Sequence, residues 1–377
     1  MTKDNKKSRF RYYPFLWINY FFIFLLLLAN LSPYVAADVF WPISVLSLIA
    51  PAVILINSLF VLLWIIFLKR YYFYSLMVLL LSYSLILNHF QINTTNVESG
   101  ISPDTSVSIL TYNVCNLSHN NDHISDKDLR KKILDYSHGL AADIICFQEF
   151  QTYPTYRINT VKDYKKGLAL KYVHTAQYLK HNTHKFLDLL VLYSKYPIIN
   201  SYDFYMDGKL FGFYVDLNIK GKTYRMFNLH LESNHFEKND YQIFSEKDTN
   251  FDKNKRNRIS GLLEKLKKYS IKRSHQARLI KKEILKSPYP VLIAGDFNDT
   301  PASYTYQSIS NGILDAFREK GSGYSNTYNG ALPPMRIDYM LFDKLIKVNS
   351  YQVLEADLSD HFPVMVNVTL DGNKANN

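Results

Sequence analysis

The run VLIAGDFNDTP, residues 291–301, decides the fold of this chain. Its apolar part, with the preceding proline, predicts a short strand over residues 290–295. Asp296 and Asn298 follow at the end of that strand, and strand ends are where a rigid scaffold presents reactive side chains. The run therefore predicts a polar site at one edge of a sheet.

Polar residues stand at or near the ends of other β-rich runs in the same way. They are Asn113 after ILTY, Glu149 after CFQ, His230 in NLHLES, Asp338 in RIDYM, and the consecutive Ser359, Asp360 and His361. Taken singly, each has a structural explanation, because a strand-end amide or carboxylate commonly caps a turn. Taken together, carboxylates, amides and two histidines suit a hard cation held by oxygen ligands, with imidazoles for proton transfer.

Short β-rich runs with few helices fill the chain beyond residue 106. Strands are expected at 107–112, 143–147, 168–179, 188–193, 211–219, 223–231, 290–295, 337–342 and 363–370. Helices are expected at 126–138 and at 256–286, the second with a break near Ser270. Because a regular βαβ alternation is missing, the pattern favours a mixed α+β sandwich over a doubly wound sheet.

The first 91 residues have the composition of a membrane segment. From Tyr12 to Gln91 the charged residues are Asp38, Lys69 and Arg70. Apolar runs cover about residues 12–31, 39–68 and 71–90, and each is long enough to span a bilayer as a helix. We therefore expect about three transmembrane helices, the last two joined by a tight hairpin.

Domain boundaries follow from these changes in composition. We expect a transmembrane anchor over residues 1–91, a linker over 92–106 and a catalytic domain over 107–372. Lysine and arginine are retained on the cytoplasmic side, so the basic N-terminus and the Lys69-Arg70 turn should both lie inside. The catalytic domain of this multi-pass membrane protein would then be extracytoplasmic, in the periplasm or its equivalent. Alternatively, the first run is a signal peptide cleaved near Ala37, which leaves this orientation unchanged.

The net charge of +11 divides between these regions. Residues 1–91 hold seven basic and two acidic residues, a net +5, and the remainder carries +6. The catalytic region is thus only mildly basic, and its charge alone is a poor argument for a nucleic-acid partner. Cys115 and Cys146 are expected as buried free thiols, with a disulfide as the alternative, and a structural zinc site is not expected.

Several motifs together identify a family. The segments TYNVCNL, DIICFQEF, LYSKYPII, FNLHLES, AGDFNDTP, RIDYM and SDHFPV resemble, in order and spacing, those of the endonuclease/exonuclease/phosphatase superfamily, which includes DNase I. The resemblance covers about residues 105–370. It implies an α+β fold, the four-layer α/β/β/α sandwich of DNase I, with the site at one end of two facing sheets.

The resemblance also implies roles for the metal-binding and substrate-binding residues. Glu149 matches the principal Mg²⁺ ligand of the family, a position that Mn²⁺ also suits. Asn113 matches a residue that contacts metal or phosphate, and Asp360 matches a further carboxylate near the metal. Asn298 matches a residue that positions the phosphate. Thr327 matches a phosphate-contacting threonine, although a turn residue is an equally good interpretation.

Catalytic roles carry over in the same way. His361 matches the histidine that contacts the phosphate or deprotonates water, and Asp338 matches the carboxylate that fixes its tautomer. Asp296, with Asn298, matches the pair that positions phosphate and water, and it is the rival candidate for the base. His230 matches a second histidine that stabilises or protonates the leaving oxygen.

Two departures from the family pattern stand out. Leu189 occupies a position where relatives commonly have glycine, which puts a close backbone approach there in doubt. Some relatives also pair a histidine with a nearby glutamate in this region, and the nearest acid here is Asp188. The long basic stretch 233–286 is a further open point, because it fits either an arm for anionic partners or an ordinary solvated helix face.

These features lead to competing hypotheses of function. The favoured one is a membrane-anchored, Mg²⁺-dependent phosphodiesterase acting on lipid headgroups or other small phosphoesters. The alternative is an extracytoplasmic endonuclease or exonuclease that acts on DNA or RNA. A catalytically silent scaffold is disfavoured because the polar set is complete. The oligomeric state is left open by the sequence.

Overall fold

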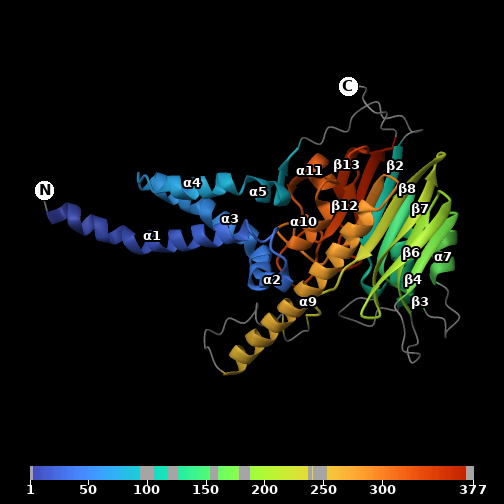
Figure 1. Ribbon diagram of the computed structural model, residues 1–377, viewed down its shortest axis with the longest axis horizontal. Coiled ribbons are helices and arrows are strands. Elements are labelled where there is room, and N and C mark those ends of the chain that lie inside the picture. Colours follow the sequence, from blue (N-terminus) through green and yellow to red (C-terminus); the bar gives the residue numbers. More distant parts are fainter. Residues whose placement is uncertain are drawn as a thin grey trace.

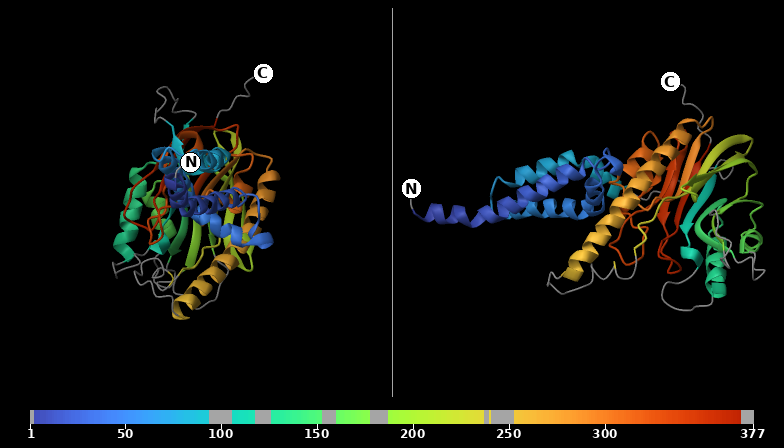
Figure 2. Two further views of the ribbon diagram at one scale, coloured as in Figure 1. Left: turned by 90° about the vertical axis from the view of Figure 1, so that its left-hand side faces the viewer. Right: turned by 60° about the horizontal axis from the view of Figure 1, so that its bottom comes forward.

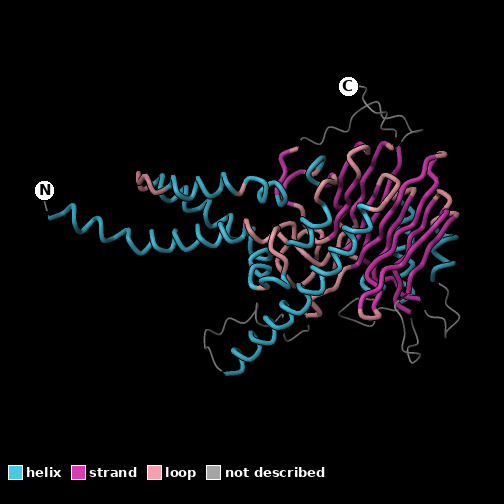
Figure 3. Tube along the Cα trace, in the orientation of Figure 1, coloured by secondary structure: helices cyan, strands magenta, loops and turns pink. Residues whose placement is uncertain are grey.

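The computed structural model describes residues 3–93, 106–117, 126–152, 160–177, 187–236, 240 and 253–370 (Figures 1 and 3). Most of the expected linker, residues 94–105, lies outside the described residues, as does the C-terminal end of the expected strand 168–179. The catalytic part lies at one end of the elongated molecule, and the apolar helices project from it (Figure 1).

Two six-stranded sheets face each other in the described part of the catalytic region. The first sheet has the order β10 (Leu314–Asp315), β12 (Asp338–Phe342), β9 (Val291–Asp296), β8 (Lys222–His230), β7 (Lys209–Ile219) and β6 (Ile198–Met206). The second sheet has the order β13 (Lys347–Val353), β14 (Val364–Thr369), β2 (Ser106–Asn113), β3 (Ile144–Thr152), β5 (Leu187–Ser194) and β4 (Tyr172–Gln177). Figure 3 shows the strands of both sheets stacked side by side.

Alternation of side chains along the strands builds the core between the sheets. In β14, Val364, Val366 and Val368 are fully buried, because successive side chains of a strand point to opposite faces. They pack in one cluster with residues of the first sheet such as Met226 and Met340. This apolar layer holds the two sheets together and fixes how their ends meet.

Helices cover the outer face of each sheet, which confirms the four-layer sandwich. On the second sheet, α6 (Asp126–Gly139) and α7 (Thr160–Gly167) pack against the aromatic residues of β3. On the first sheet, α9 (Lys253–Leu285) and α10 (Tyr304–Ser310) bury their apolar sides. The short helices η1 (Cys115–Leu117) and α11 (Ala316–Lys320) lie in connections.

The N-terminal helices cover the three expected apolar runs, and the third run is bent. Among the described residues, α1 (Lys3–Ala29) and α3 (Pro42–Ile66) are long and apolar enough to cross a membrane, and α2 (Ala37–Phe40) connects them. The third apolar run is not one straight helix. It divides into α4 (Tyr72–Leu81) and α5 (Tyr83–His89), bent by 69°, so two helices can span, or three if the bent pair counts as one.

The bend at Ser82 coincides with one local and one long-range hydrogen bond of its side chain. Ser82 Oγ lies 2.7 Å from the carbonyl oxygen of Val78, and it accepts a hydrogen bond from Asn30 Nδ2 at 2.7 Å. A serine hydroxyl that bonds back to the preceding turn commonly bends a helix. After α5 the chain forms β1 (Phe90–Ile92), which pairs with β11 (Ser322–Tyr324) in the catalytic region.

Other expectations need smaller corrections. The helix expected at 256–286 has no break near Ser270, because α9 is continuous and the buried Ser270 hydroxyl accepts from Arg273 one turn later at 3.3 Å. The strand expected at 168–179 begins only at Tyr172, after a turn that follows α7. Helix α7 and strands β6 and β13 were not expected from the sequence.

Hydrogen bonds join the N-terminal apolar helices, called the anchor helices below, directly to the loop that follows β9. Thr300 Oγ1 donates to the Ser47 carbonyl oxygen at 2.9 Å. Pro51 explains why this carbonyl is free, because a proline within a helix lacks the N–H that would bond to the residue four positions earlier. The loop after β9 thus supplies the hydrogen bond that α3 cannot make for itself.

Further contacts reinforce this joint. Asn88 Nδ2 donates to the Pro301 carbonyl oxygen at 3.2 Å, and Ser32 Oγ lies 2.7 Å from the Ala302 carbonyl oxygen. The buried Arg336 donates to the Asn88 carbonyl oxygen at 2.8 Å. The turn after α1 and the helices α3 and α5 therefore all contact the segment that begins only a few residues after Asp296.

Candidate active site

Three neighbouring strands of the first sheet bring acidic and imidazole groups to one edge. Asp296 ends β9 and pairs in register with His230 of the parallel strand β8. On its other side, Asp296 lies opposite Asp338 of the antiparallel strand β12. The register therefore places these three residues in a row, as expected when polar residues follow adjacent strands.

Gly295 permits this register. Its φ is +142°, and a Cβ atom at this position would lie 2.0 Å from the Leu229 carbonyl oxygen. A side chain at this point would push β9 away from β8. The glycine before Asp296 is thus required for the close approach of the two strands.

The second sheet contributes a bridge between the two sheets. Asn113 ends β2, and its Nδ2 donates to Glu149 Oε1 at 3.1 Å and to Asp296 Oδ2 at 3.0 Å. Glu149 lies where the pairing of β3 with β5 shifts register, and its φ is +50°. This irregularity turns Glu149 toward the polar edge rather than into the regular alternation of the strand.

Glu149 is an ionised and accessible carboxylate. Its side chain is 27% exposed, and Oε2 accepts a hydrogen bond from Asn116 Nδ2 at 3.1 Å. His230 Nε2 lies 3.3 Å from Oε1. Burial alone would raise the pKa of Glu149, but His230 and the Asn113 amide outweigh burial and lower it to about 2. The group is therefore negatively charged at neutral pH.

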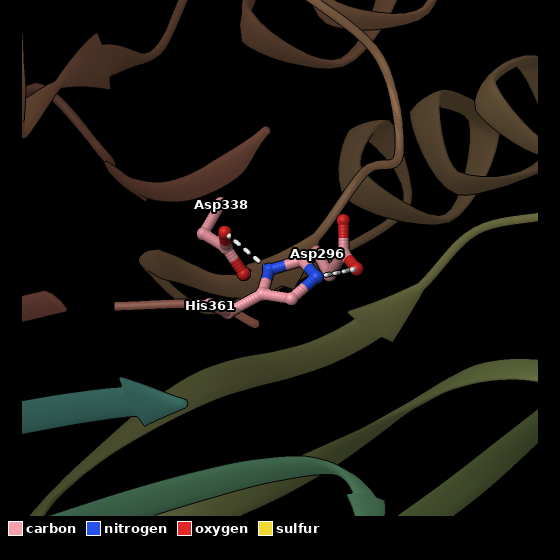
Figure 4. A group of neighbouring side chains, drawn as sticks. All are labelled: Asp296, Asp338 and His361. Carbon is pink, nitrogen blue, oxygen red and sulfur yellow. Dashed lines mark hydrogen bonds and ion pairs between the residues drawn. The ribbon is translucent and has the colours of Figure 1, made fainter. Parts of the chain in front are cut away.

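His361 lies between two carboxylates (Figure 4). Its Nδ1 is 2.9 Å from Asp338 Oδ2, and its Nε2 is 3.7 Å from Asp296 Oδ2. The three side chains are buried, and one ligand atom from each lies within 4.8 Å of the others. The Ser359 hydroxyl donates a hydrogen bond to the Asn113 carbonyl oxygen. This bond holds the turn that leads to His361.

The charges in this cluster shift the pKa values of its members. Burial would lower the pKa of His361, but Asp338 and Asp296 raise it to about 10. Burial raises the pKa of Asp296 to about 6, against the opposing effect of the His361 charge. Burial would also lower the pKa of His230, yet Glu149 and Asp296 leave it raised. Both imidazoles are therefore biased toward the protonated form.

Asn298 and Thr327 orient these acidic groups. The backbone N–H of Asn298 donates to Asp296 Oδ1 at 2.7 Å, and its Nδ2 donates to the Leu231 carbonyl oxygen at 3.0 Å and to Asp296 Oδ2 at 3.2 Å. Thr327 is fully buried, and its Oγ1 accepts from the backbone N–H of Asp338 at 3.1 Å and of Ile337 at 3.0 Å. Thr327 therefore holds the backbone at Asp338 in place. This contact agrees with the interpretation of Thr327 as a turn residue.

Asp360 and Glu149 are both close enough to Cys115 to affect the charge of its thiol. Burial raises the pKa of the Cys115 thiol, and the negative charges of Asp360 and Glu149 raise it further. A single neighbour shared in this way places the two carboxylates in one region of the site. Ser359 Oγ also lies 3.3 Å from Asp360 Oδ1.

The residues present fit a hard divalent cation. Glu149 is ionised, half-buried and within one region with Asp360, and oxygen atoms of one or two carboxylates are what Mg²⁺ prefers in proteins. The buried Asp338 Oδ1 has no hydrogen-bond partner among the described residues, which leaves one further oxygen in the cluster unsatisfied. The cluster of Asp296, Asp338 and His361 is a second group with metal-ligand geometry.

The structure brings the expected site residues to one end of the sandwich. They are Asn113, Glu149, His230, Asp296, Asn298, Thr327, Asp338, Asp360 and His361. The chain's two cysteines, both described, are free thiols; Cys146 is buried and Cys115 is half-buried. Leu189 packs in the apolar cluster beneath α6, and the side chain of Asp188 lies outside the described residues.

Sequence reasoning missed Asn116, which contacts the site, and Asn228, a buried amide on the same strand as His230. Asn116 donates to Glu149, and only its place within the motif TYNVCNL could have pointed to it. Asn228 is fully buried between the sheets; it accepts from Gln148 Nε2 at 2.7 Å and donates to the carbonyl oxygen of Val191 at 3.1 Å. An amide inside the apolar run of β8 was the available signal, because a buried amide needs partners.

Comparisons with known proteins follow the same division of the chain. A sequence model described as the Endonuclease/Exonuclease/phosphatase family matches residues 110–361. Another, described as a domain of unknown function, matches residues 12–89. No curated protein matches the chain.

Solved structures share the sandwich at low sequence identity. An endonuclease/exonuclease/phosphatase family protein from Bacteroides thetaiotaomicron is 19% identical, with a TM-score of 0.50 over 71% of this chain and 98% of that one. A protein of the same description from Beutenbergia cavernae is 16% identical, with a TM-score of 0.51 over 71% and 72%. A mannosyl-6-phosphatase from Bacteroides thetaiotaomicron is 17% identical, with a TM-score of 0.47 over 70% and 99%. At these low identities, the similarity between this chain and the solved structures shows a shared fold and nothing further.

Proposed function

We propose that this chain, which belongs to the endonuclease/exonuclease/phosphatase family, is a membrane-anchored, Mg²⁺-dependent phosphodiesterase whose substrate is a phosphodiester at the bilayer surface. Members of the family are phosphoester hydrolases. The observation that carries the proposal is the direct hydrogen bonding of the catalytic loop to the apolar helices, four residues after Asp296. The proposed place of the substrate follows from it, and the proposed reaction follows from the residues of the site.

Asp296 is the group that accepts the proton of the attacking water. Its pKa of about 6 leaves it ionised at neutral pH and still basic enough to take a proton. Asn298 holds its carboxylate in place from both the backbone and the side chain. Its buried position next to the other polar groups supports this role over a purely structural one.

His361 acts as a cation rather than as the base. A pKa raised to about 10 keeps the imidazole protonated, and its hydrogen bond to Asp338 keeps it oriented. A fixed positive charge beside the attacking group favours binding of a phosphate and stabilises its equatorial oxygens as charge develops. Asp338 is thus a positioning residue that also maintains the charge of His361.

His230 supplies a proton to the leaving oxygen. As the water oxygen bonds to phosphorus and the ester P–O bond breaks, the departing oxygen gains negative charge and needs a proton. The raised pKa of His230 and its contact with Glu149 favour a protonated imidazole at that point. The proton taken by Asp296 and the one given by His230 balance the hydrolysis.

Glu149 would hold Mg²⁺, with Asp360 as a nearby second carboxylate. When bound there, Mg²⁺ neutralises charge on the phosphate oxygens as a Lewis acid. Asn113 and Asn116 keep the Glu149 carboxylate in a fixed orientation by donating to its two oxygens. The buried cluster around His361 serves proton chemistry in this proposal, because its imidazole already bonds to Asp338.

The joint between anchor and loop favours a membrane phosphodiester as substrate. Thr300, Pro301 and Ala302 contact helices of the anchor, so the site is held close to the membrane rather than at the end of a flexible tether. Such a connection keeps the site within reach of a substrate at the bilayer surface. Lipid headgroups and other small phosphoesters at the surface are therefore the substrate class that fits.

The catalytic region is proposed to face the extracytoplasmic side. The basic residues at the N-terminal end of α1 and the Lys69-Arg70 turn are both expected on the cytoplasmic side. The end of α5 then leads into β1 and the sandwich on the opposite side. A reporter enzyme active only in the cytoplasm, fused after residue 370, should be inactive; activity would reverse the orientation.

A nuclease is the second candidate. The observation that favours it is the row of exposed cations on α9, including Arg256, Lys267 and Lys268, since polynucleotide phosphates attract such surfaces. The same cations also suit anionic lipid. The two candidates therefore need a substrate panel to separate them.

The test is a panel of substrates with the purified full-length protein in lipid nanodiscs. Phospholipids, sphingolipids, inositol phosphates, and single- and double-stranded DNA would be offered in parallel with Mg²⁺, with an Asp296→Asn variant as the inactive control. The proposal expects headgroup release from lipid to exceed cleavage of DNA at least about tenfold in kcat/KM. Cleavage of DNA with no headgroup release would replace the proposal with the nuclease.

A further inference from the structure

The N-terminal half of α9 is strongly basic. Residues 255–268 contain six lysines or arginines and one acidic residue, Glu264. Arg256, Lys267 and Lys268 are exposed, and Leu263 between them is 37% exposed. We call residues 255–268 the basic arm. It combines positive charge with an exposed apolar side chain, the combination found where helices rest on membrane surfaces.

The remainder of α9 is fixed to both the sandwich and the anchor. Ala277 and Ile280 pack in the apolar core beneath the first sheet. Arg278 forms a two-pronged ion pair with Asp38 of α2, at 3.0 and 2.9 Å, and the backbone N–H of Ala37 donates to Ser274 Oγ at 3.1 Å. The direction of the basic arm relative to the anchor is therefore set by these contacts.

We call the contacts at residues 274–278 the clamp. From the clamp, the basic arm extends toward the side on which the anchor helices project. In Figures 1 and 2, the N-terminal end of α9 lies beyond α2 along the long axis of the molecule, in the direction in which α1 and α3 run. The clamp at residues 274–278 leaves about 20 residues of helix before it, or about 30 Å at 1.5 Å per residue. The arm thus reaches the level at which the anchor leaves the catalytic region.

We propose that the basic arm lies on the bilayer surface and binds anionic phospholipid headgroups. A membrane around α1 and α3 has its surface near the point where these helices meet the sandwich, and the arm extends to that level beside them. Positive charge within about a Debye length of an anionic surface is attracted to it. The arm is then a second contact with the membrane, and it fixes the tilt of the catalytic region over the bilayer. Because the arm is basic, this tilt depends on the charge of the lipids.

The inference goes beyond the proposed function, because it concerns lipid binding and not hydrolysis. Its test therefore uses the inactive Asp296→Asn protein, full length and reconstituted in nanodiscs. A fluorescent probe on Asn257→Cys, in a Cys115→Ser background, reports the arm, and a probe on Lys166→Cys of α7 reports the far side of the sandwich (Figure 1). Lipids with a headgroup-attached quencher measure the proximity of each probe to the surface.

The arm probe should be quenched at least about twofold more in nanodiscs with about 30% anionic lipid than in neutral ones, and high salt should remove the difference. The α7 probe should not respond. Replacing the exposed arm cations by R256Q, K267Q and K268Q together should abolish the response. The matched control, K132Q, K162Q and K166Q with the arm probe, removes three cations from α6 and α7 and should leave it unchanged.

Equal quenching in neutral and anionic nanodiscs would overturn the proposal, as would an unchanged response in the arm variant. Binding of a single-stranded oligonucleotide, measured by anisotropy, provides the competing outcome. If the arm variant loses oligonucleotide binding and the quenching is independent of lipid charge, the arm binds nucleic acid instead. The variants replace exposed side chains, so thermal unfolding of each should match the parent protein.

Discussion

Asp296 lies directly opposite Asp338 on the neighbouring antiparallel strand, so two buried carboxylates face each other at one edge of the first sheet. His361 lies between them, at 2.9 Å from Asp338 and 3.7 Å from Asp296. Two adjacent acids at such a place disfavour ionisation of both unless a cation accompanies them. The protonated imidazole supplies that charge, and the arrangement sets the pH range of activity.

The rate should therefore depend on pH in two steps. Asp296 must be ionised to accept a proton, so kcat/KM should rise as pH increases through about 6. His361 must stay protonated, so kcat/KM should fall as pH increases toward about 10. Asp338→Asn removes the carboxylate that most raises the pKa of His361, so the upper limb should move to lower pH. A pH–rate profile of both proteins measures this, and an unmoved upper limb contradicts the role given to His361.

Glu149→Gln should remove the main metal ligand while keeping the shape of the side chain. Since the Gln side chain is neutral, Mg²⁺ affinity should fall, and the rate at fixed Mg²⁺ should fall at least about a hundredfold. Titration calorimetry of Mg²⁺ binding gives a readout that does not depend on activity. The exposed Glu319→Gln serves as the control and should bind Mg²⁺ like the parent. Unchanged Mg²⁺ affinity in Glu149→Gln would refute the metal site.

His230→Asn should affect substrates according to their leaving groups. A lipid alcohol is a poor leaving group and needs a proton, so its hydrolysis should slow about a hundredfold. A p-nitrophenolate departs without one, so its hydrolysis should slow only a few-fold. The ratio of the two losses is the measurement. Equal losses for both substrates would mean that His230 does not protonate the leaving oxygen.

Gly295→Ala should strongly destabilise the catalytic region. The new Cβ would meet the Leu229 carbonyl oxygen at 2.0 Å with φ at +142°, so β9 and β8 would have to separate. We expect a loss of at least about 3 kcal/mol in the free energy of unfolding, the scale of a severe steric and backbone effect. Gly261→Ala is the matched control, because its Cβ would meet nothing within 4 Å in the interior of α9.

The control should be neutral or stabilise the protein by up to about 1 kcal/mol, since alanine favours a helix over glycine. Thermal unfolding of the full-length protein in detergent compares the two. Similar melting temperatures for both variants would show that the close approach of β8 and β9 is not required.

Thr300→Val should weaken the joint between the anchor and the catalytic loop. Valine keeps the shape but cannot donate to the Ser47 carbonyl oxygen, which Pro51 leaves without a helical partner. An unpaired buried carbonyl costs about 1–3 kcal/mol. Both stability and kcat should fall, whereas Thr223→Val, in β8 and away from the joint, should change neither. A kcat equal to that of the parent would show that the anchor does not support the catalytic loop.

The positions of the site residues could be predicted from the sequence, but the contact between the anchor helices and the loop after β9 could not. Asp296, Asn298 and His361 stand in short motifs at strand ends, where local patterns and the strand period suffice to place them. The contact of Thr300 with Ser47 joins residues 253 positions apart. Pro51 leaves the Ser47 carbonyl oxygen without a helical partner, and no local rule says which distant residue would reach it.

Local rules also failed where long-range packing decided the outcome. Ser270 suggested a helix break, yet its burial and its bond with Arg273 keep α9 continuous. Ser82 lies in an unbroken apolar run, yet its contact with Asn30 of another helix accompanies a sharp bend. In both cases the residue type was visible in the sequence, and the partner that decided its effect was not.

The most direct measurement of the central claim is headgroup release from nanodiscs by the full-length protein, followed with and without Mg²⁺. The account predicts release that depends on Mg²⁺, disappears on chelation and falls at least about a hundredfold in Glu149→Gln. Release that continues in chelator, or that Glu149→Gln leaves intact, would contradict a Mg²⁺-dependent phosphodiesterase acting at the membrane.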